Sequence, residues 1–138
     1  MGDSPEGSLA EHDWSAEVAN PGTLREVLGA SPPPLSDYGL DSVLVDEREA
    51  SVTLRFSARA VPAGAADLWR ERGHNAVEFT LVCVGVTDFQ VDAWSGWPTT
   101  RATLTGRRVL LAGRGKHVSF TAAEIRAEPP VGQLWGAE

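Results

Sequence analysis

Residues 76–93 decide the fold, and they read AVEFTLVCVGVTDFQVDA. Apolar side chains occupy every second position of this stretch: Val77, Phe79, Leu81 and Cys83 in its first half, then Phe89, Val91 and Ala93 in its second. A period of two is the spacing of a β-strand that buries one face. Gly85 and Asp88 interrupt the run, so a bend is expected over residues 85–88. The stretch therefore predicts two neighbouring strands, and we expect both to be central strands of a sheet.

Shorter alternating runs lie on both sides of this stretch. Residues 43–45 and 52–56 alternate around the charged sequence of residues 46–49, which predicts a hairpin with one buried face. Towards the C-terminus, residues 102–105, 108–111, 117–122 and 124–127 predict further strands separated by glycine-containing turns. Consecutive strands with short turns and no long helix between them favour antiparallel pairing.

The N-terminal part follows a different pattern. One or two helical turns are plausible over residues 13–20, and a short helix is expected to start at Thr23, because Glu26 stands at capping-box spacing, and to end at Gly29. The predicted fold class is therefore α+β: one or two short N-terminal helices, then a mostly antiparallel sheet of six to eight strands, which can curl or form a sandwich.

Length and composition indicate one folding unit. The chain has 138 residues, of which 42% are hydrophobic and 22% charged, as in ordinary globular domains. Residues 1–12 are polar and aperiodic, so we expect a flexible tail there and a single domain over residues 13–138. The longest apolar run is far shorter than the ~20 residues of a membrane span. The N-terminus also lacks the pattern of a signal peptide, so we expect a cytoplasmic protein without membrane contact.

No catalytic or metal-binding pattern is present, and the sequence predicts no enzyme, no catalytic residue, no metal and no cofactor. Gly113-Arg114-Gly115-Lys116 resembles part of a phosphate loop, but the flanking positions do not fit, and a turn is favoured. His12, His74 and His117 are far apart and have no partner at helical spacing. Cys83, the single cysteine, lies in the apolar run and is expected to be a small buried hydrophobe.

The net charge of −7 is distributed unevenly along the chain. Residues 1–50 contain eleven acidic residues against two basic ones, whereas residues 101–138 contain six basic residues against three acidic ones. An acidic surface repels nucleic-acid phosphate and accelerates encounter with a basic protein. We therefore expect no direct nucleic-acid binding and a protein partner with a basic surface, although solubility alone can also account for the acids.

The tryptophans are candidate interface anchors. Five tryptophans in 138 residues is a high number, and Trp94 and Trp97 flank a glycine where the strand pattern breaks. Half-covered aromatic rings at such edges are typical of binding hot spots. The other interpretation is that the rings cover the ends of the sheet.

Several short segments, taken in order, resemble the immunity protein 50 family of bacterial polymorphic toxin systems. They span about residues 14–97: Trp14 before Asn20-Pro21, Pro33-Pro34-Leu35 before Asp41-Ser42-Val43, Val52-Thr53-Leu54-Arg55-Phe56, Pro62 before Trp69, Asn75, and Val84-Gly85-Val86 through Phe89 to Trp94. The last forty residues contain no matching motif. The ending of the bend is also extended, as Trp94-Ser95-Gly96-Trp97.

The resemblance implies a small α+β cytoplasmic protein that neutralises a cognate toxin domain by binding and occluding it. The acids of residues 37–49 are then a natural complement to a basic toxin surface, with the tryptophans as anchors. The candidate partner-binding residues are Asp37, Asp41, Asp46, Glu47, Glu49, Trp94 and Trp97. A generic sheet-rich interaction or small-ligand-binding domain without a toxin partner is the alternative. The sequence leaves open whether the protein is a monomer or a dimer.

Overall fold

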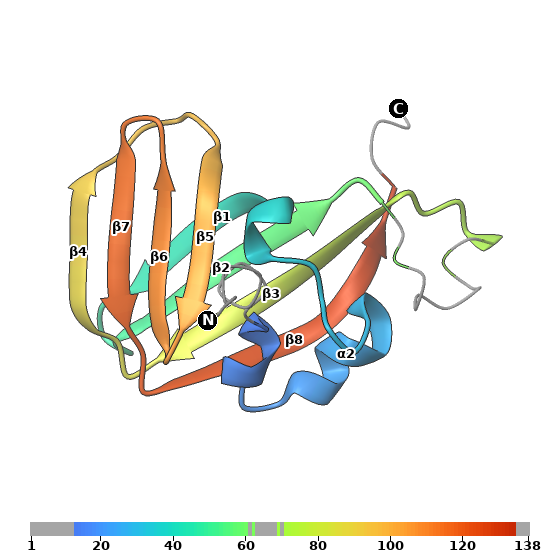
Figure 1. The fold of residues 1–138 in the computed structure, drawn as a ribbon, viewed down its shortest axis with the longest axis horizontal. Helices are drawn as coiled ribbons and strands as arrows, with labels where there is room; N and C mark the ends of the chain where they lie inside the picture. The colour runs from blue at the N-terminus through green and yellow to red at the C-terminus, as the bar shows by residue number, and fades with distance from the viewer. Residues whose placement is uncertain (1–12, 61, 63–68, 70, 135–138) are drawn as a thin grey trace, which may run out of the picture.

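The computed structural model describes residues 13–60, 62, 69 and 71–134. Within them the N-terminal part forms two 3-10 turns and one helix (Figure 1): η1 (Trp14–Glu17), α2 (Pro21–Leu28) and η2 (Leu35–Asp37). Eight strands follow: β1 (Gly39–Asp46), β2 (Ser51–Ala58), β3 (Ala76–Val84), β4 (Thr87–Ala93), β5 (Thr99–Thr105), β6 (Arg108–Gly113), β7 (Lys116–Thr121) and β8 (Glu124–Gln133). The predicted tail, residues 1–12, lies outside the described residues.

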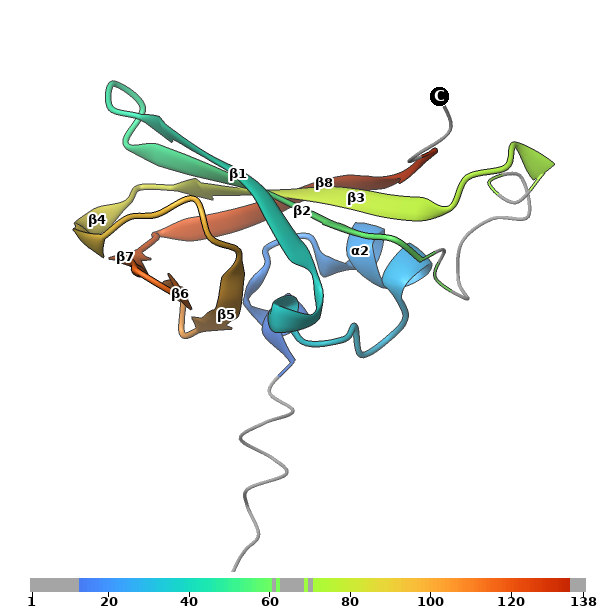
Figure 2. The same cartoon turned by 90° about the horizontal axis from the view of Figure 1, so that it is seen from above.

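The strands form two antiparallel sheets of four, which confirms the predicted α+β class. Sheet A has the order β1-β2-β3-β8, and sheet B has the order β4-β7-β6-β5. Sheet B and the N-terminal segment lie side by side beneath sheet A, as Figure 2 shows. The two sheets do not close into a barrel.

Both sheets are joined at one corner, where two neighbouring strands bend together. β3 continues into β4 through Gly85 and Val86, and β7 continues into β8 through Ala122 and Ala123. The backbone N–H of Ala123 donates to the carbonyl oxygens of Val84, at 2.9 Å, and Gly85, at 3.2 Å. Gly85 has a φ of +64°, and a Cβ placed on it would lie 2.6 Å from the Cβ of Ala123. The corner therefore requires glycine on two grounds, its backbone conformation and the close approach of the second strand.

The hydrophobic core lies between sheet A on one side and sheet B with the N-terminal segment on the other. β2 and β3 direct alternate apolar residues inward, as their period of two predicts, and Phe56, Phe79 and Phe120 are among the largest fully buried side chains. Phe79 is the centre of an aromatic cluster. Its ring lies 5.5 Å from that of Trp14 and 5.4 Å from that of Phe56, both stacked, and 5.0 Å from Tyr38, edge-on.

The N-terminal segment completes two of the four sheet edges with hydrogen bonds. The Asn20 side chain both donates to the carbonyl oxygen of Ala127 on β8 and accepts from its N–H, each at 2.9 Å. The hydroxyl of Ser36 accepts from the N–H of Ala102 on β5 at 2.9 Å and donates to its carbonyl oxygen at 3.3 Å. Each side chain thus replaces one residue of a missing strand.

Asn20 also explains why the predicted start of the helix is wrong. Thr23 and Glu26 lie inside α2, which begins at Pro21, and the predicted capping box is not used. Proline is favoured in the first turn because its missing N–H needs no partner there. The side chain of Asn20, the residue before it, bonds to β8 instead of capping the helix. The predicted end at Gly29 is confirmed, with a φ of +106°.

A small polar network holds η1 against α2. Asp13 accepts hydrogen bonds from the N–H of Ser15 at 3.0 Å and from its hydroxyl at 2.6 Å, and forms an ion pair with Arg25 at 3.0 Å. Burial alone would raise the pKa of Asp13, but the Ser15 hydrogen bonds and the Arg25 charge together hold the pKa below its ordinary value of 3.8.

The lowered pKa of Asp13 predicts a loss of stability in acid. A depressed carboxyl pKa stabilises the fold fully above the unfolded value, about 3.9, and this stabilisation is lost as the pH falls through the folded value. Urea denaturation followed between about pH 5 and pH 2 should show a smaller decline in stability for Asp13→Asn than for the unsubstituted protein. Parallel curves for the two proteins would contradict the assignment.

Candidate partner-binding surface

Four of the exposed apolar side chains of the two sheets gather where the sheets diverge. β1 is an edge strand of sheet A and β4 an edge strand of sheet B, and Figure 2 shows the β1–β2 hairpin standing away from β4. Four large hydrophobic residues on these two strands are substantially exposed: Leu44 (64%), Val45 (50%), Phe89 (40%) and Val91 (49%). We call the two strands and the turn between β1 and β2 the open side of the molecule.

The position of β4 corrects the prediction that residues 89–93 form a central strand. All seven residues of β4 are exposed, and among the described strands it pairs with β7 alone. The face on which Phe89 lies is the expected inner face, since its ring is 5.9 Å from that of buried Phe120. The hairpin of β1 and β2 diverges before it can cover that face, so the apolar positions stay accessible.

An open hollow lies at the base of this divergence. Its lining includes Val45 from β1, Val86 from the corner and Phe89 from β4. The N–H of Val86 donates to the carbonyl oxygen of Ala50 at 2.9 Å, which joins the hairpin turn to the corner. The hollow therefore has an apolar base, and the β1–β2 turn and the corner that flank it are hydrogen-bonded to each other.

Acidic side chains form the rim of the hollow. Asp46 and Glu47 line it, and Glu49 lies in the same turn and is exposed like Glu47. One carboxylate oxygen of Asp46 accepts from the N–H groups of Arg48, at 3.1 Å, and Glu49, at 3.2 Å, so this acid also holds the turn. The arrangement joins apolar contact area to negative charge, which suits a partner that carries apolar residues among basic ones.

The other two acids predicted as contacts lie at the opposite end of β1. Asp37 ends η2, and Asp41 is the extra residue of a bulge between Leu40 and Ser42 in the pairing of β1 with β2. Both are exposed. The acids of residues 37–49 therefore follow one edge strand from end to end, and two of the five, Asp46 and Glu47, line the hollow.

The two tryptophans predicted as anchors lie beyond the far end of β4. Trp97 stacks on the guanidinium group of Arg114, 4.4 Å from the ring centre, and the ammonium group of Lys116 lies 4.9 Å from the ring centre of Trp94. Lys116 also donates to the carbonyl oxygen of Trp97 at 2.9 Å. The rings are about half exposed and form a second surface, separated from the acidic turn by the length of β4.

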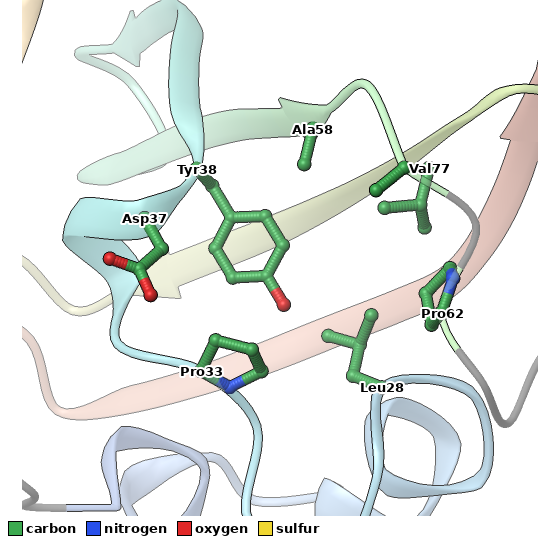
Figure 3. A pocket seen from close by; sticks show the side chains of 8 residues that line it. Leu28, Pro33, Asp37, Tyr38, Ala58, Pro62 and Val77 are labelled. Carbon is green, nitrogen blue, oxygen red and sulfur yellow. The ribbon is translucent and has the colours of Figure 1, made fainter.

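A second pocket lies under sheet A beside the proline-rich connector. Figure 3 shows the hydroxyl group of Tyr38 directed into it, between Leu28 and Pro33. Burial, with a smaller contribution from neighbouring Asp37, raises the pKa of Tyr38 to about 12, so the phenol stays protonated at neutral pH. Pro62, which also lines this pocket, is flanked by residues outside the described ranges.

The thiol of Cys83 is buried and protonated at neutral pH. Its side chain is fully buried in β3, as the sequence predicts, and burial raises the pKa of the thiol to about 12. The residues 113–116 form the predicted turn between β6 and β7. Among the described residues, no three potential ligands stand close enough to hold a metal ion. The described helices are also too short or too polar to cross a membrane.

Leu44, Phe89 and Val91 are candidate contacts that were not predicted from the sequence. The period of two was interpreted as burial in both strands, although the alternate positions of the two strands differ. The alternating positions of β4 are Asp88, Gln90 and Asp92, whereas β3 has the apolar residues Val82 and Val84 among its own. Acids on the second face were the available signal that β4 is an edge strand.

Comparison with known proteins matches the chain to a protein family. Residues 20–106 match the sequence model of a family described as Immunity protein 50, which covers more than half of the chain and ends between β5 and β6. Neither a curated protein nor a solved structure matches the chain.

Proposed function

Because the chain belongs to the immunity protein 50 family, we propose that it neutralises a cognate toxin domain by binding that domain and occluding its active site. In this proposal the chemistry belongs to the toxin, and the immunity protein has no catalytic activity of its own. It acts in the cytoplasm, where a toxin would reach its target.

The open side is the surface that supports this proposal best. It combines exposed apolar residues, a hollow and an acidic turn on one side of the molecule, and interfaces of protein inhibitors have an apolar centre with a charged rim. The acids would increase the rate of encounter with a basic toxin, while Val45 and Phe89 would supply buried contact area after docking. The proposal rests on one observation: a member of an immunity family has exposed apolar residues, a hollow and an acidic turn together on one side.

Titration against the product of the gene adjacent to that of this protein tests the proposed function. We expect nanomolar binding that weakens as salt is added, together with loss of the toxin's activity in the complex. If no product of a neighbouring gene binds, the immunity function is wrong.

Neutralising the acidic turn should slow association. The variant Asp46→Asn/Glu47→Gln/Glu49→Gln removes three negative charges, and the asparagine amide oxygen can still accept the two turn hydrogen bonds of Asp46. Stopped-flow measurement at low salt should show an association rate about tenfold lower, with a weaker dependence on ionic strength.

A matched control separates this local effect from net charge. Glu26→Gln/Glu71→Gln/Glu128→Gln removes the same charge from exposed positions away from the open side. Its association rate should stay close to that of the unsubstituted protein. Equal rates for the two triple variants would show that the acidic turn has no special role.

A further inference from the structure

We propose that the toxin is held by strand addition: an extended segment of the toxin, in which basic and apolar residues alternate, pairs with residues 42–46 of β1 along the edge that no other described strand occupies. This inference rests on the proposed function and names the mode of recognition and the chemistry of the partner segment. It follows from a comparison of the four sheet edges, from the side chains on β1, and from the charges at its ends.

Of the four edges, β1 is the one prepared for pairing. The edges of β8 and β5 already receive hydrogen bonds from Asn20 and Ser36. The edge strand β4 is irregular, with two register shifts in its pairing with β7, and bulges of this kind hinder edge pairing. In β1, by contrast, Ser42 to Asp46 pair with Arg55 to Ser51 in unbroken register. An edge strand presents a row of unpaired backbone groups that another chain can use.

The side chains of β1 provide specificity for such a segment. Successive residues of a strand point to opposite faces, and Val45 lines the hollow, so Leu44 is on the outer face. A strand added beside β1 would place alternate side chains over the hollow, next to Val45 and Phe89, and the remaining ones beside Leu44. Peptides that add a strand to a sheet are recognised in this manner, through backbone hydrogen bonds and alternate side-chain contacts.

Charge decides which occupant fits this edge. Asp41 and Asp46 stand at either end of the regular stretch, and Glu47 and Glu49 follow in the turn. If a second copy paired with β1 in antiparallel fashion, the acids of both copies would converge, and like charges opposite one another are destabilising. A partner segment with lysine or arginine would instead place opposite charges across the new pair of strands. The edge is thus protected against self-association and open to a basic strand.

The edge can be tested without the toxin. A short capped peptide in which lysine and valine alternate is titrated into the isotope-labelled full-length protein, and hydrogen exchange of the β1 amides is measured by NMR. We expect alternate amides within residues 42–46, those that face solvent in the free protein, to become protected. A peptide in which glutamate replaces lysine should leave them unprotected. If the lysine peptide at millimolar concentration protects none of these amides, strand addition is overturned.

A pair of variants localises the effect. Leu44→Lys places a positive charge on β1, a common device against edge pairing, and should weaken binding of the lysine peptide by at least about tenfold. Val131→Lys makes the corresponding change on β8, at the other edge of sheet A, where Val131 is also about half exposed. It should leave binding unchanged. Equal weakening of peptide binding by both variants would contradict pairing at β1. Thermal unfolding of each variant, compared with that of the unsubstituted protein, checks that both variants are folded.

The toxin complex then separates failure of this inference from failure of the proposed function. Toxin binding that leaves the β1 amides exchanging at their free rate would overturn strand addition and leave the immunity function standing. If the peptide protects the β1 amides but the toxin module does not bind, the edge accepts a basic strand and the toxin is not the protein that supplies it. Protection of the same amides by both supports the whole inference.

Discussion

Replacing Phe79 with alanine is expected to lower the free energy of unfolding by about 4 kcal/mol, measured by urea denaturation at neutral pH. The side chain is 1% exposed and contacts three aromatic rings from three parts of the chain. Its removal would leave a cavity between sheet A and the N-terminal segment. Because Trp14 stacks on this ring and Tyr38 meets it edge-on, the alanine variant should also loosen the packing of η1 and η2.

Two variants show whether the loss comes from the cavity. Phe79→Leu keeps most of the apolar volume and should cost less than half as much. Phe89→Ala deletes the same atoms from a ring that is already 40% exposed, and about 1 kcal/mol is expected. Similar losses for Phe79→Ala and Phe89→Ala would mean that Phe79 is not the centre of the core.

Gly85→Ala should produce the second large effect, a loss of about 3 kcal/mol in the free energy of unfolding. A left-handed conformation costs a residue with a Cβ about 1–2 kcal/mol, and the overlap with Ala123 adds a packing cost of similar size. Urea denaturation gives the total. The loss should appear in the stability of both sheets together, because β3 and β4 are one continuous segment through this corner.

A double-mutant cycle separates the two costs at this corner. Ala123→Gly removes the opposing Cβ, so the pair Gly85→Ala/Ala123→Gly should recover the packing cost and retain the conformational cost. Gly106→Ala is the matched control for conformation alone, since Gly106 has a φ of +57° and open space around it. Additive effects in the cycle would show that the two residues are not in contact.

The strand pattern could be predicted from the sequence because each strand that faces the core repeats its apolar residues every second position. Each of the eight strands overlaps a stretch that these local signals mark, although β8 continues to Gln133, beyond its predicted end at residue 127. The β6–β7 turn and the end of α2 at Gly29 lie where they were predicted. Local signals also explain the error at the start of the helix. Thr23 and Glu26 have the spacing of a capping box, but the helix begins earlier, at Pro21. The residue before it, Asn20, bonds to Ala127 on β8, which lies 107 positions away in the sequence.

The sheet order and the candidate site could not be predicted, because both depend on where strands lie in space. The alternation of residues 89–93 is the same for a covered strand and for an edge strand, and only the divergence of the hairpin exposes Phe89 and Val91. The acids of residues 37–49 could be found by counting charges. The topology alone places Asp46 and Glu47 beside an apolar hollow. It also places Trp94 and Trp97 at the other end of β4. Their roles as partner contacts stay predictions.

The hydrogen bonds between Asn20 and Ala127 have a consequence for the timing of folding during synthesis. The edge that Asn20 completes belongs to β8, the last strand in the sequence, and β8 also pairs with β3 in sheet A. During translation, the N-terminal segment therefore cannot dock on β8 until more than a hundred further residues have been synthesised. Folds dominated by such non-local contacts form slowly. If the protein neutralises a toxin, protection of the cell lags behind translation, and a store of folded protein made in advance is more useful than rapid induction.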